Sequence, residues 1–458
     1  QPSGYPPYVA GAAAQAWPAN SGYFPQGAPS QAQQRQRGGQ QQHFDRDFGK
    51  GGASSSGSGA VSSKAVVARD SSEEDEDGDY DDDEDGALDE DMQHFADVCY
   101  SLLRYSQDAV GELGWVEEAF ESLSDPHDRE LLLPSTTPGM LREMQQRVAE
   151  NGAFLRMLVE SDEEAREFLE IPEGYQVQQR NSVKVHTVLR QFVRDWAEEG
   201  APERETQYGC LLRALEKYIP LDSAASGRYQ RPGGRPQVLT PGSGLARLPF
   251  EVARMGYRVQ GNEFSYHMLQ GSKWVLNEST GANMHTIFPF ILSLEHRRGS
   301  TDHMRGIKIP DVWPSGVLCP EGAPMADLSM CAGEFVEVYS PQEKHWDAVL
   351  TCFFLDTAKN VFLYIRTIAH IIRPGGLWAN IGPLLYHYAE QANSISVELS
   401  WEEVKPAIEK YFEFKEEDMR EAYYTTNAQG LFHTRYRCKY FVAIRNDVPA
   451  SGKSFPVF

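Results

Sequence analysis

Apolar residues in the first half of the chain recur every three to four positions, which is the spacing of one face of an α-helix. Four stretches show this spacing, and we expect a helix in each: residues 94–107, 137–162, 185–200 and 204–219. Gly200 closes the third stretch and Pro202 follows it, so this helix is predicted to stop there. The pattern predicts four or five helices before the first strand.

Between residues 236 and 446 the pattern changes to short apolar runs that alternate with helical segments. Such alternation is typical of an α/β fold, in which helices cover both faces of a parallel sheet. Residues 285–325 are rich in His, Arg, Pro and Gly and are expected to form an insertion over the sheet. The predicted strands are residues 237–242, 257–262, 327–333, 346–356, 376–382 and 439–446, and the predicted helices are residues 245–255, 357–372 and 400–411.

These patterns divide the chain into a helical domain over residues 92–230, an α/β domain over residues 231–446 and a C-terminal tail over residues 447–458. A longer tail precedes them. Its first 69 residues are rich in Gln, Gly, Ser, Ala and Pro, and residues 70–91 hold fifteen acidic residues and no basic one. Such a composition cannot bury enough apolar surface to fold, which predicts a disordered acidic tail over residues 1–91.

Charge and cysteine usage narrow the function classes. Most of the net charge of −23 lies in the acidic block, and without a basic stripe we expect no nucleic-acid partner. The chain has no run of eighteen apolar residues, so we expect no membrane span. Its six cysteines lack a C-x-x-C pair, which argues against a disulfide framework or a zinc site. Free thiols fit a reducing compartment, so we expect a cytoplasmic protein, with a nuclear location as the alternative. The sequence is also compatible with a homodimer.

A glycine-rich turn suggests a cofactor site. The first predicted strand runs into Pro-Gly-Ser-Gly, where Gly242 and Gly244 let the backbone approach a ligand, and Glu263 follows Gly242 by 21 residues. A carboxylate at that position can accept hydrogen bonds from both hydroxyls of a ribose. A dinucleotide site would have a third glycine where Arg247 stands, which weakens the nicotinamide or flavin interpretation. The alternative is S-adenosylmethionine, which has a ribose but no phosphate.

The last third of the chain favours the methyl donor. An apolar strand, a helix, then Arg-Pro-Gly-Gly and another strand follow one another over residues 346–383. This order resembles the fourth and fifth strands of class I S-adenosylmethionine-dependent methyltransferases. The resemblance implies their Rossmann-like, seven-stranded α/β sheet.

Four longer segments resemble one family within that class. Residues 191–200, 238–277, 347–361 and 372–388 are together similar to the carnosine N-methyltransferase family, also described as N2227-like. The likeness covers roughly residues 92–446. Family members transfer a methyl group from S-adenosylmethionine to an imidazole nitrogen of carnosine, which gives anserine and S-adenosylhomocysteine. No metal is implied.

The resemblance also implies site residues. The donor-binding residues of the family fall on Gln191, Arg194, Gly242, Glu263, Glu334 and Cys352, and its acceptor-binding residues fall on Asp356, His387 and Tyr436. Glu334 stands where the family has aspartate, so its carboxylate is kept but one methylene longer. The segment around Tyr436 departs most from the family. Tyr424 matches another family tyrosine, which would line the acceptor pocket or pack in the core.

The chemistry gives Asp356 and His387 catalytic roles. A neutral imidazole has one N–H and one lone pair, so a carboxylate that accepts the N–H aims the other nitrogen at the methyl group. Asp356 could do this, or it could cap the helix predicted over residues 357–372. His387 would bind the acceptor or relay a proton. Two alternatives stay open: an acceptor histidine in a peptide or protein, and a non-catalytic donor-binding scaffold with a recruiting tail.

Overall fold

The computed structural model describes residues 90–132, 138–221, 234–322, 324–389 and 396–450. The tail predicted over residues 1–91 lies outside these ranges except for its last two residues, which instead begin the first helix. Of the predicted C-terminal tail, residues 447–450 are described and the remainder lies outside. The predicted domain boundary at residue 230 also falls outside the described residues.

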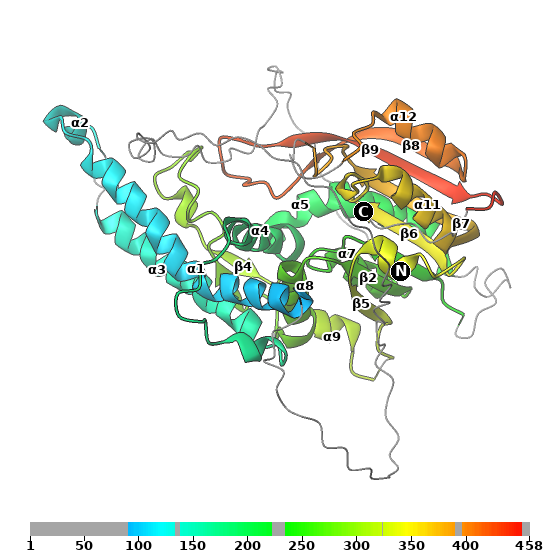
Figure 1. Cartoon of the computed structure of the whole chain (residues 1–458), viewed down its shortest axis with the longest axis horizontal. Coiled ribbons are helices and arrows are strands. Elements are labelled where there is room, and N and C mark those ends of the chain that lie inside the picture. The colour runs from blue at the N-terminus through cyan, green and yellow to red at the C-terminus, as the bar shows by residue number, and fades with distance from the viewer. Residues whose placement is uncertain (1–89, 133–137, 222–233, 323, 390–395, 451–458) are drawn as a thin grey trace, which may run out of the picture. The chain divides into compact units, whose positions relative to one another are not determined.

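The helices predicted before the first strand are confirmed, with changed lengths. Helix α1 (Glu90–Glu121) lies beside α3 (Pro138–Glu160), with the short α2 (Pro126–Glu130) between them, and α4 (Gln179–Trp196) contacts α1 (Figure 1). The fourth predicted helix is composite. It consists of α5 (Ala201–Arg204), one π-helical turn (Glu205–Gly209) and α6 (Cys210–Tyr218). Short 3₁₀ turns occupy Ala165–Phe168 and Glu198–Gly200.

Seven strands form one sheet in the order β5-β2-β1-β6-β7-β9-β8. Neighbouring strands are parallel except β9, which is antiparallel to both β7 and β8. This is the class I methyltransferase arrangement, and its strand order reverses between β1 and β6, where open α/β sheets bind ligands. The strands are β1 (Gln237–Pro241), β2 (Arg258–Glu263), β5 (Leu328–Ala332), β6 (Trp346–Cys352), β7 (Ile372–Gly382), β8 (Phe412–Tyr423) and β9 (Arg435–Arg445).

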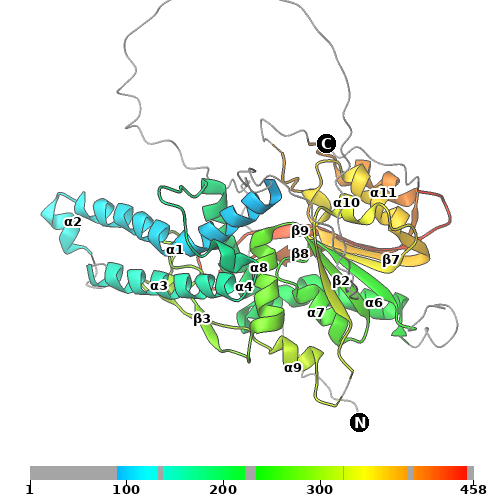
Figure 2. The ribbon, with the colours of Figure 1, turned by 60° about the horizontal axis from the view of Figure 1, so that its bottom comes forward.

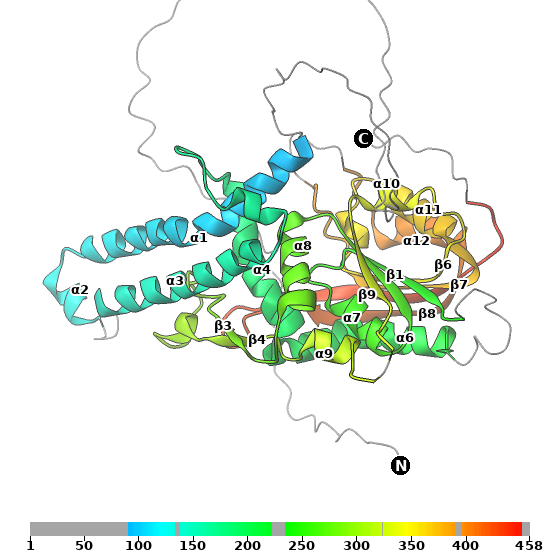
Figure 3. The ribbon, with the colours of Figure 1, turned by 90° about the horizontal axis from the view of Figure 1, so that it is seen from below.

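Each face of the sheet carries a separate hydrophobic core, because successive side chains of a strand point to opposite faces. Val238 and Leu377 pack into the core that includes α6 and α7 (Arg247–Arg254). Their neighbours Leu239 and Trp378 pack into the core below α10 (Phe335–Tyr339), α11 (Val361–Ile371) and α12 (Trp401–Glu409). Figures 2 and 3 show the two helix layers on either side of the strands.

The helical region (residues 90–221) shares the first of these cores with the sheet. Buried residues of α1, α3 and α4 belong to the same cluster as the strands, and α8 (Tyr266–Lys273) with the π-helical turn Trp274–Glu278 packs against α4. All described residues fall within one compact unit. Side chains on α4 can therefore contribute to a site built on the sheet.

The segment predicted as an insertion, residues 285–325, holds a separate two-stranded sheet of β3 (His285–Ile287) and β4 (Ile307–Ile309). A 3₁₀ turn (Asp302–Met304) and α9 (Pro314–Leu318) complete it. Its strands contact α3 and α4, and α9 contacts α7, so it packs beside the helical region. Within the described ranges, every helix is too short or too polar to span a bilayer.

Candidate active site

The carboxyl ends of four parallel strands bring most of the predicted donor-binding residues to one edge of the sheet. The glycine turn follows β1, Glu263 ends β2, Glu334 follows β5 and Cys352 ends β6. Strands β5, β2, β1 and β6 are neighbours in that order. Gly242, directly after β1, and Cys352, at the end of β6, therefore lie at the same edge of the sheet although they are 110 positions apart in the sequence.

The glycine turn and Glu263 hold each other in place. Gly242 and Gly244 have φ angles of +67° and +55°, which glycine adopts without strain. The main-chain N–H of Gly244 donates to Glu263 Oε2 at 2.8 Å, and Oε1 accepts the N–H groups of Phe264 and Ser265 at 2.8 and 2.9 Å. Burial raises the pKa of Glu263, and these N–H groups oppose that shift. A carboxylate has about four acceptor positions, so one remains for a ligand hydroxyl.

Glu334 has a structural task in addition to its predicted one. It is the N-cap of α10, and its Oε2 accepts the main-chain N–H groups of Val336 and Glu337 at 2.6 and 2.9 Å. Burial raises the pKa of this carboxyl group. Gly333, the residue before Glu334, donates its N–H to the main-chain oxygen of Glu263 at 3.1 Å, which places Glu334 beside the end of β2.

Gln191 and Arg194 lie on one face of α4, as their spacing predicts, and Arg194 Nη1 donates to Gln191 Oε1 at 3.1 Å. The buried guanidinium also donates through Nε and Nη2 to Gln207 Oε1 at 3.2 and 2.8 Å. Its carbon lies 5.2 Å from the ring centroid of Tyr208 and 4.8 Å from that of Tyr424. We call these five residues the Arg194 cluster.

Sequence reasoning missed two members of this cluster, Gln207 and Tyr208. Both lie in the π-helical turn Glu205–Gly209, which breaks the fourth predicted helix. Single π-turns of this kind are frequent at functional sites because they re-aim side chains. The continuous apolar spacing of residues 204–219 carried no signal for this break.

The Arg194 cluster reaches the sheet at Cys352. The buried thiol lies 3.9 Å from Arg194 Nη2 and 3.8 Å from Gln207 Oε1. Burial raises the pKa of Cys352, so the sulfur stays protonated at neutral pH. The side chain is therefore a packing surface rather than a nucleophile.

Arg247, which replaces the third glycine of a dinucleotide motif, ties α4 to the glycine turn. Its Nη1 donates to the main-chain oxygen of Asp195 at 2.7 Å and to Asp311 Oδ1 at 2.6 Å. The guanidinium also lies over the ring of Trp196, whose Nε1 donates to the main-chain oxygen of Leu245 at 2.8 Å. The buried guanidinium of Arg247 stands where a dinucleotide motif has its third glycine. The helix and the strand therefore do not pack as closely here as that glycine would allow.

Asp356 and His387 lie together, Asp356 in the turn after β6 and His387 in the segment after β7. The carboxyl group of Asp356 is 1% exposed, and Oδ2 accepts the main-chain N–H of Leu385 at 2.8 Å. The main-chain oxygen of Asp356 accepts the N–H of His387 at 3.0 Å. Among the described residues, none donates a hydrogen bond to Asp356 Oδ1. The burial raises the pKa of Asp356, which the N–H of Leu385 and the nearby His387 partly offset.

The alternative role for Asp356 as a helix cap is wrong. Asp356 lies in a 3₁₀ turn, Leu355–Thr357, and α11 begins only at Val361. Asn360 caps that helix, since its Oδ1 accepts the N–H groups of Phe362 and Leu363. The buried carboxylate of Asp356 is thus free of a capping task.

Phe353 packs between Tyr424, a member of the Arg194 cluster, and Tyr436, which lies near Asp356. Phe353 lies 5.6 Å from Tyr436 and 4.9 Å from Tyr424, measured between ring centroids. Burial raises the pKa of Tyr436, and the negative charge of the Asp356 carboxylate raises it further. Tyr424 accepts a hydrogen bond from Gln191 Nε2 at 2.6 Å, so it lies against the predicted donor residues. Phe353 was not predicted.

Three of the seven described non-glycine residues with a left-handed backbone lie at this site. Phe353, Tyr386 and Thr425 have φ angles of +51°, +53° and +48°, which cost non-glycine residues about 1–3 kcal/mol each. They directly follow or precede Cys352, His387 and Tyr424 in the chain. Such strain persists only where the surrounding structure enforces it, which is typical of functional sites.

Comparison with known proteins identifies the family. A model of carnosine N-methyltransferases matches residues 172–447. Carnosine N-methyltransferase of Mus musculus is 35% identical over 360 residues, covering 77% of this chain and 86% of the mouse protein. Carnosine N-methyltransferase of Dictyostelium discoideum is 33% identical over 377 residues, covering 78% of this chain and 77% of that protein. Carnosine N-methyltransferase of Schizosaccharomyces pombe is 40% identical over 215 residues, covering 46% of this chain and 55% of that protein. The chain belongs to the carnosine N-methyltransferase family.

Every predicted site residue, from Gln191 to Tyr436, lies inside the region that matches the carnosine N-methyltransferase family, whereas α1 and α3 precede it. Across the described residues, no group of three or more His, Cys, Asp or Glu side chains is placed to hold a metal ion.

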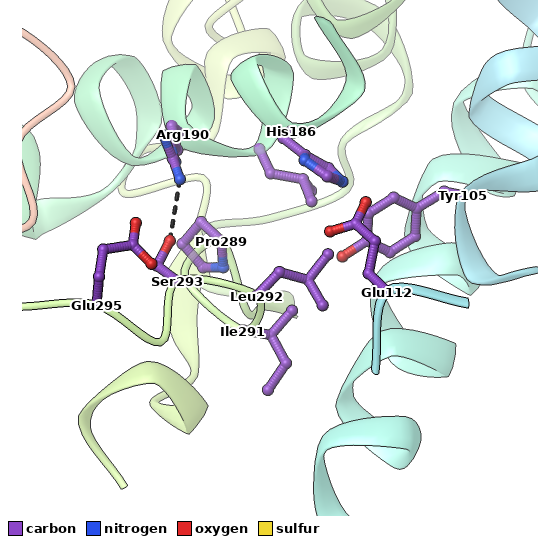
Figure 4. Close-up of a pocket in the computed structure, with 10 residues that line it drawn as sticks. Tyr105, Glu112, His186, Arg190, Pro289, Ile291, Leu292, Ser293 and Glu295 are labelled. Atoms are coloured by element: carbon purple, nitrogen blue, oxygen red, sulfur yellow. Dashed lines mark hydrogen bonds between the residues drawn. The ribbon is translucent and has the colours of Figure 1, made fainter. Parts of the chain in front are cut away.

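A small cavity of about 110 Å³ lies on another part of α4, between that helix, α1 and the segment after β3 (Figure 4). His186 and Arg190 of α4 line it, and Arg190 Nη2 donates to Ser293 Oγ at 3.0 Å. None of the predicted site residues lines this cavity. In this member of the carnosine N-methyltransferase family, α4 therefore presents the Arg194 cluster and the cavity on different parts of its surface.

Proposed function

We propose that this protein is an S-adenosylmethionine-dependent N-methyltransferase that methylates an imidazole nitrogen of carnosine, giving anserine. Membership of the carnosine N-methyltransferase family supports this function. The observation that carries it is Asp356, a buried carboxylate with one oxygen that no described residue bonds, in the turn that follows β6, the strand next to β1. An unsatisfied buried acceptor at this position fits an imidazole N–H.

The residues at the carboxyl edge of the sheet fit the methyl donor. Glu263 retains one acceptor position for a ribose hydroxyl, and the 65% exposed ring of Phe264 beside it offers an aromatic face to the adenine. Arg194 can pair with the donor's carboxylate, with Gln191 and Gln207 fixing its orientation. When bound, S-adenosylmethionine supplies a methyl group on a sulfonium sulfur that is already activated for transfer.

Asp356 then orients the acceptor. Its Oδ1 accepts the N–H of the neutral imidazole, which fixes the tautomer and directs the other nitrogen's lone pair toward the donor side of the site. The same carboxylate stabilises the imidazolium that forms. Leu385 and His387 hold Asp356 through its side chain and main chain, so this orientation does not have to be reached during the reaction.

The aromatic rings around this point keep water out. Phe353 packs against both Tyr424 of the Arg194 cluster and Tyr436, so the three rings form one aromatic group beside Asp356. Exclusion of water strengthens the Asp356–imidazole contact, because the effective dielectric constant falls. Positioning and desolvation are the two contributions that this chain's own residues make.

Labelled S-adenosylmethionine tests the proposal directly. The full chain is incubated with carnosine, homocarnosine or a histidine-containing peptide, and products are identified by mass spectrometry. We expect label on the imidazole of carnosine. Label on the peptide alone would show that the acceptor is a peptide histidine, and donor binding without transfer to any imidazole would indicate a non-catalytic scaffold. The Asp356→Asn variant should still bind S-adenosylhomocysteine, which separates its role from donor binding.

We further propose that the enzyme acts in the cytoplasm. All six cysteines are free thiols, which fits a reducing compartment. Fractionation of cells that express the natural protein would test this, and recovery with a secretory compartment would contradict it.

A further inference from the structure

Asp195, in the last turn of α4, has a buried carboxylate with one oxygen in use. The residue is 0% exposed, and Oδ1 accepts the hydroxyl of Tyr208 at 2.7 Å. Arg194 Nη1 lies 3.6 Å from the same oxygen. No residue in the described part of the chain donates a hydrogen bond to Oδ2. Leaving a buried charged acceptor unbonded is costly, so such an atom calls for a ligand.

The free oxygen faces the glycine turn. A Cβ atom added to Gly244 would lie 3.7 Å from Asp195 Oδ2, and this oxygen is the nearest atom to that position. Gly244 is the second glycine of the turn after β1, at the point where the sheet's strand order reverses. The absence of a side chain at residue 244 leaves room in front of the carboxylate.

Asp195 cannot turn away from the glycine turn. Arg247 Nη1 donates to its main-chain oxygen at 2.7 Å and also binds Asp311. The next residue, Trp196, donates its ring N–H to the main-chain oxygen of Leu245. These bonds hold the main chain of Asp195 beside the turn, and the Tyr208 hydroxyl holds its carboxylate through Oδ1, so the position of Oδ2 is set before any ligand binds.

We propose that Asp195 Oδ2 binds the α-ammonium group of the methionine part of S-adenosylmethionine. This inference rests on the proposed function and adds a binding residue to it. The methionine part is a zwitterion, and Arg194 and Asp195 present opposite charges side by side, one for the carboxylate and one for the ammonium. The adenosine part of the donor has no cation and offers only neutral hydrogen-bond donors, which bind a carboxylate less strongly.

Isothermal titration calorimetry with two adenosine ligands tests the assignment. S-adenosylhomocysteine carries the amino acid part, and 5′-methylthioadenosine lacks it. The Asp195→Asn substitution keeps an oxygen for the Tyr208 hydroxyl while removing the charge. We expect it to weaken S-adenosylhomocysteine by about 10- to 100-fold, the value of a charge-assisted hydrogen bond, and to change 5′-methylthioadenosine less than 2-fold.

The wild-type protein provides a second measurement that does not depend on the variant's folding. It should bind the deaminated analogue of S-adenosylhomocysteine about 10- to 100-fold more weakly than S-adenosylhomocysteine itself. In Asp195→Asn this preference should disappear. Asp311→Asn is the matched control, because it removes charge from the same buried network but does not face Gly244. It should lower the melting temperature and leave the preference intact.

Three results would overturn the assignment. Equal weakening of both adenosine ligands in Asp195→Asn would assign the residue a structural role. Wild-type protein that binds S-adenosylhomocysteine and its deaminated analogue equally would show that the ammonium has no partner here. Wild-type protein that binds none of the three ligands would overturn the proposed donor itself, which the wild-type titrations reveal before any variant is made.

Discussion

The main-chain N–H of Leu385 donates to Asp356 Oδ2 at 2.8 Å, which holds a buried carboxylate that leaves its second oxygen unbonded. The bond links the segment after β7 to the turn after β6, so two chain segments 29 residues apart position one functional group. A side chain at this position whose polar atoms all made hydrogen bonds would give a more stable fold. This residue is therefore where stability and function should separate most clearly.

Asp356→Asn should abolish methyl transfer and stabilise the fold at neutral pH. Transfer is expected to fall about 100-fold or more, because an amide cannot stabilise the imidazolium. Burial raises the pKa of Asp356 in the folded state. Above that raised pKa the buried charge lowers the wild type's free energy of unfolding, and below the unfolded-state pKa the carboxyl group has no such effect. The variant should gain about 1–2 kcal/mol at pH 7.5, and this gain should vanish near pH 4. Urea unfolding at the two pH values measures it.

A variant that is destabilised at both pH values would contradict this account. Asp302→Asn provides the comparison, since Asp302 is only half-buried and accepts the main-chain N–H groups of Arg298 and Gly299. It should lose stability rather than gain it, and transfer should be unchanged.

Gly242→Ala should destabilise the protein by about 2–4 kcal/mol, from a left-handed backbone and from overpacking together. The φ angle is +67°, and the new Cβ would lie 2.6 Å from Cδ2 of Phe354, whose ring stacks on Tyr364. Gly375→Ala is the matched control, because its φ angle is +80° but its Cβ would meet nothing within 4 Å. It should cost about 1 kcal/mol. If urea unfolding shows equal losses of unfolding free energy in the two variants, the ring of Phe354 moves aside at no cost.

Arg247→Met should cost about 3 kcal/mol or more, because it removes a buried cation from Asp311, Glu251 and the main chain of Asp195. It should also weaken S-adenosylhomocysteine binding, since the end of α4 loses its link to the glycine turn. Arg254→Met removes a half-exposed partner of Glu251 and should cost less than about 1 kcal/mol, with no effect on binding. Loss of stability without loss of affinity in Arg247→Met would show that Trp196 alone positions α4.

The sequence predicted the fold well where hydrophobic patterning decides structure. All six apolar runs between residues 237 and 446 are strands, five of them parallel and the last, β9, antiparallel, because strands buried within a sheet must be apolar. Strand β8 was missed, since Phe412–Tyr423 carries charged side chains along an edge of the sheet, where only one neighbour, β9, needs to be matched. The π-helical turn was missed for the opposite reason: its apolar spacing is that of an ordinary helix.

Within the candidate site, the sequence pointed to groups whose spacing or motif is local, such as the glycine turn and the pair Gln191 and Arg194. It could not point to Asp195 or Gln207, because their contacts form only when the fold brings α4, the π-helical turn and the glycine turn together. In the sequence Asp195 simply follows Arg194. Only the fold shows that one of its oxygens faces Gly244 and has no partner among the described residues.

His267 should make the protein sensitive to acid. Burial, and next Lys184 and His94, lower its pKa from 6.5 to about 3. Ser101 donates its hydroxyl to Val98, so it accepts the Nε2–H of a neutral imidazole. A lowered folded-state pKa gives stability that is complete above pH 6.5 and is lost toward pH 3, about 3 kcal/mol of it by pH 4.

His267→Gln should remove this part of the acid loss, so its free energy of unfolding should fall less than the wild type's between pH 7 and pH 4. The exposed His433→Gln is the control and should follow the wild-type curve. Parallel curves for all three proteins would show that His267 does not bind protons during acid unfolding.

Tyr424 and Tyr436 should separate donor from acceptor recognition, although both contact the same ring, Phe353. Tyr424→Phe removes the hydroxyl that accepts from Gln191 Nε2, so the Arg194 cluster loses a buried bond and the Kd for S-adenosylhomocysteine should rise about 3- to 10-fold. Tyr436→Phe leaves that cluster unchanged and alters the side facing Asp356, so the KM for carnosine should rise instead. The contrast depends on Phe353, whose φ of +51° fixes its ring between the two tyrosines. If both variants raise the same constant, the donor and acceptor share one pocket wall and the division between the two sites at Phe353 is wrong.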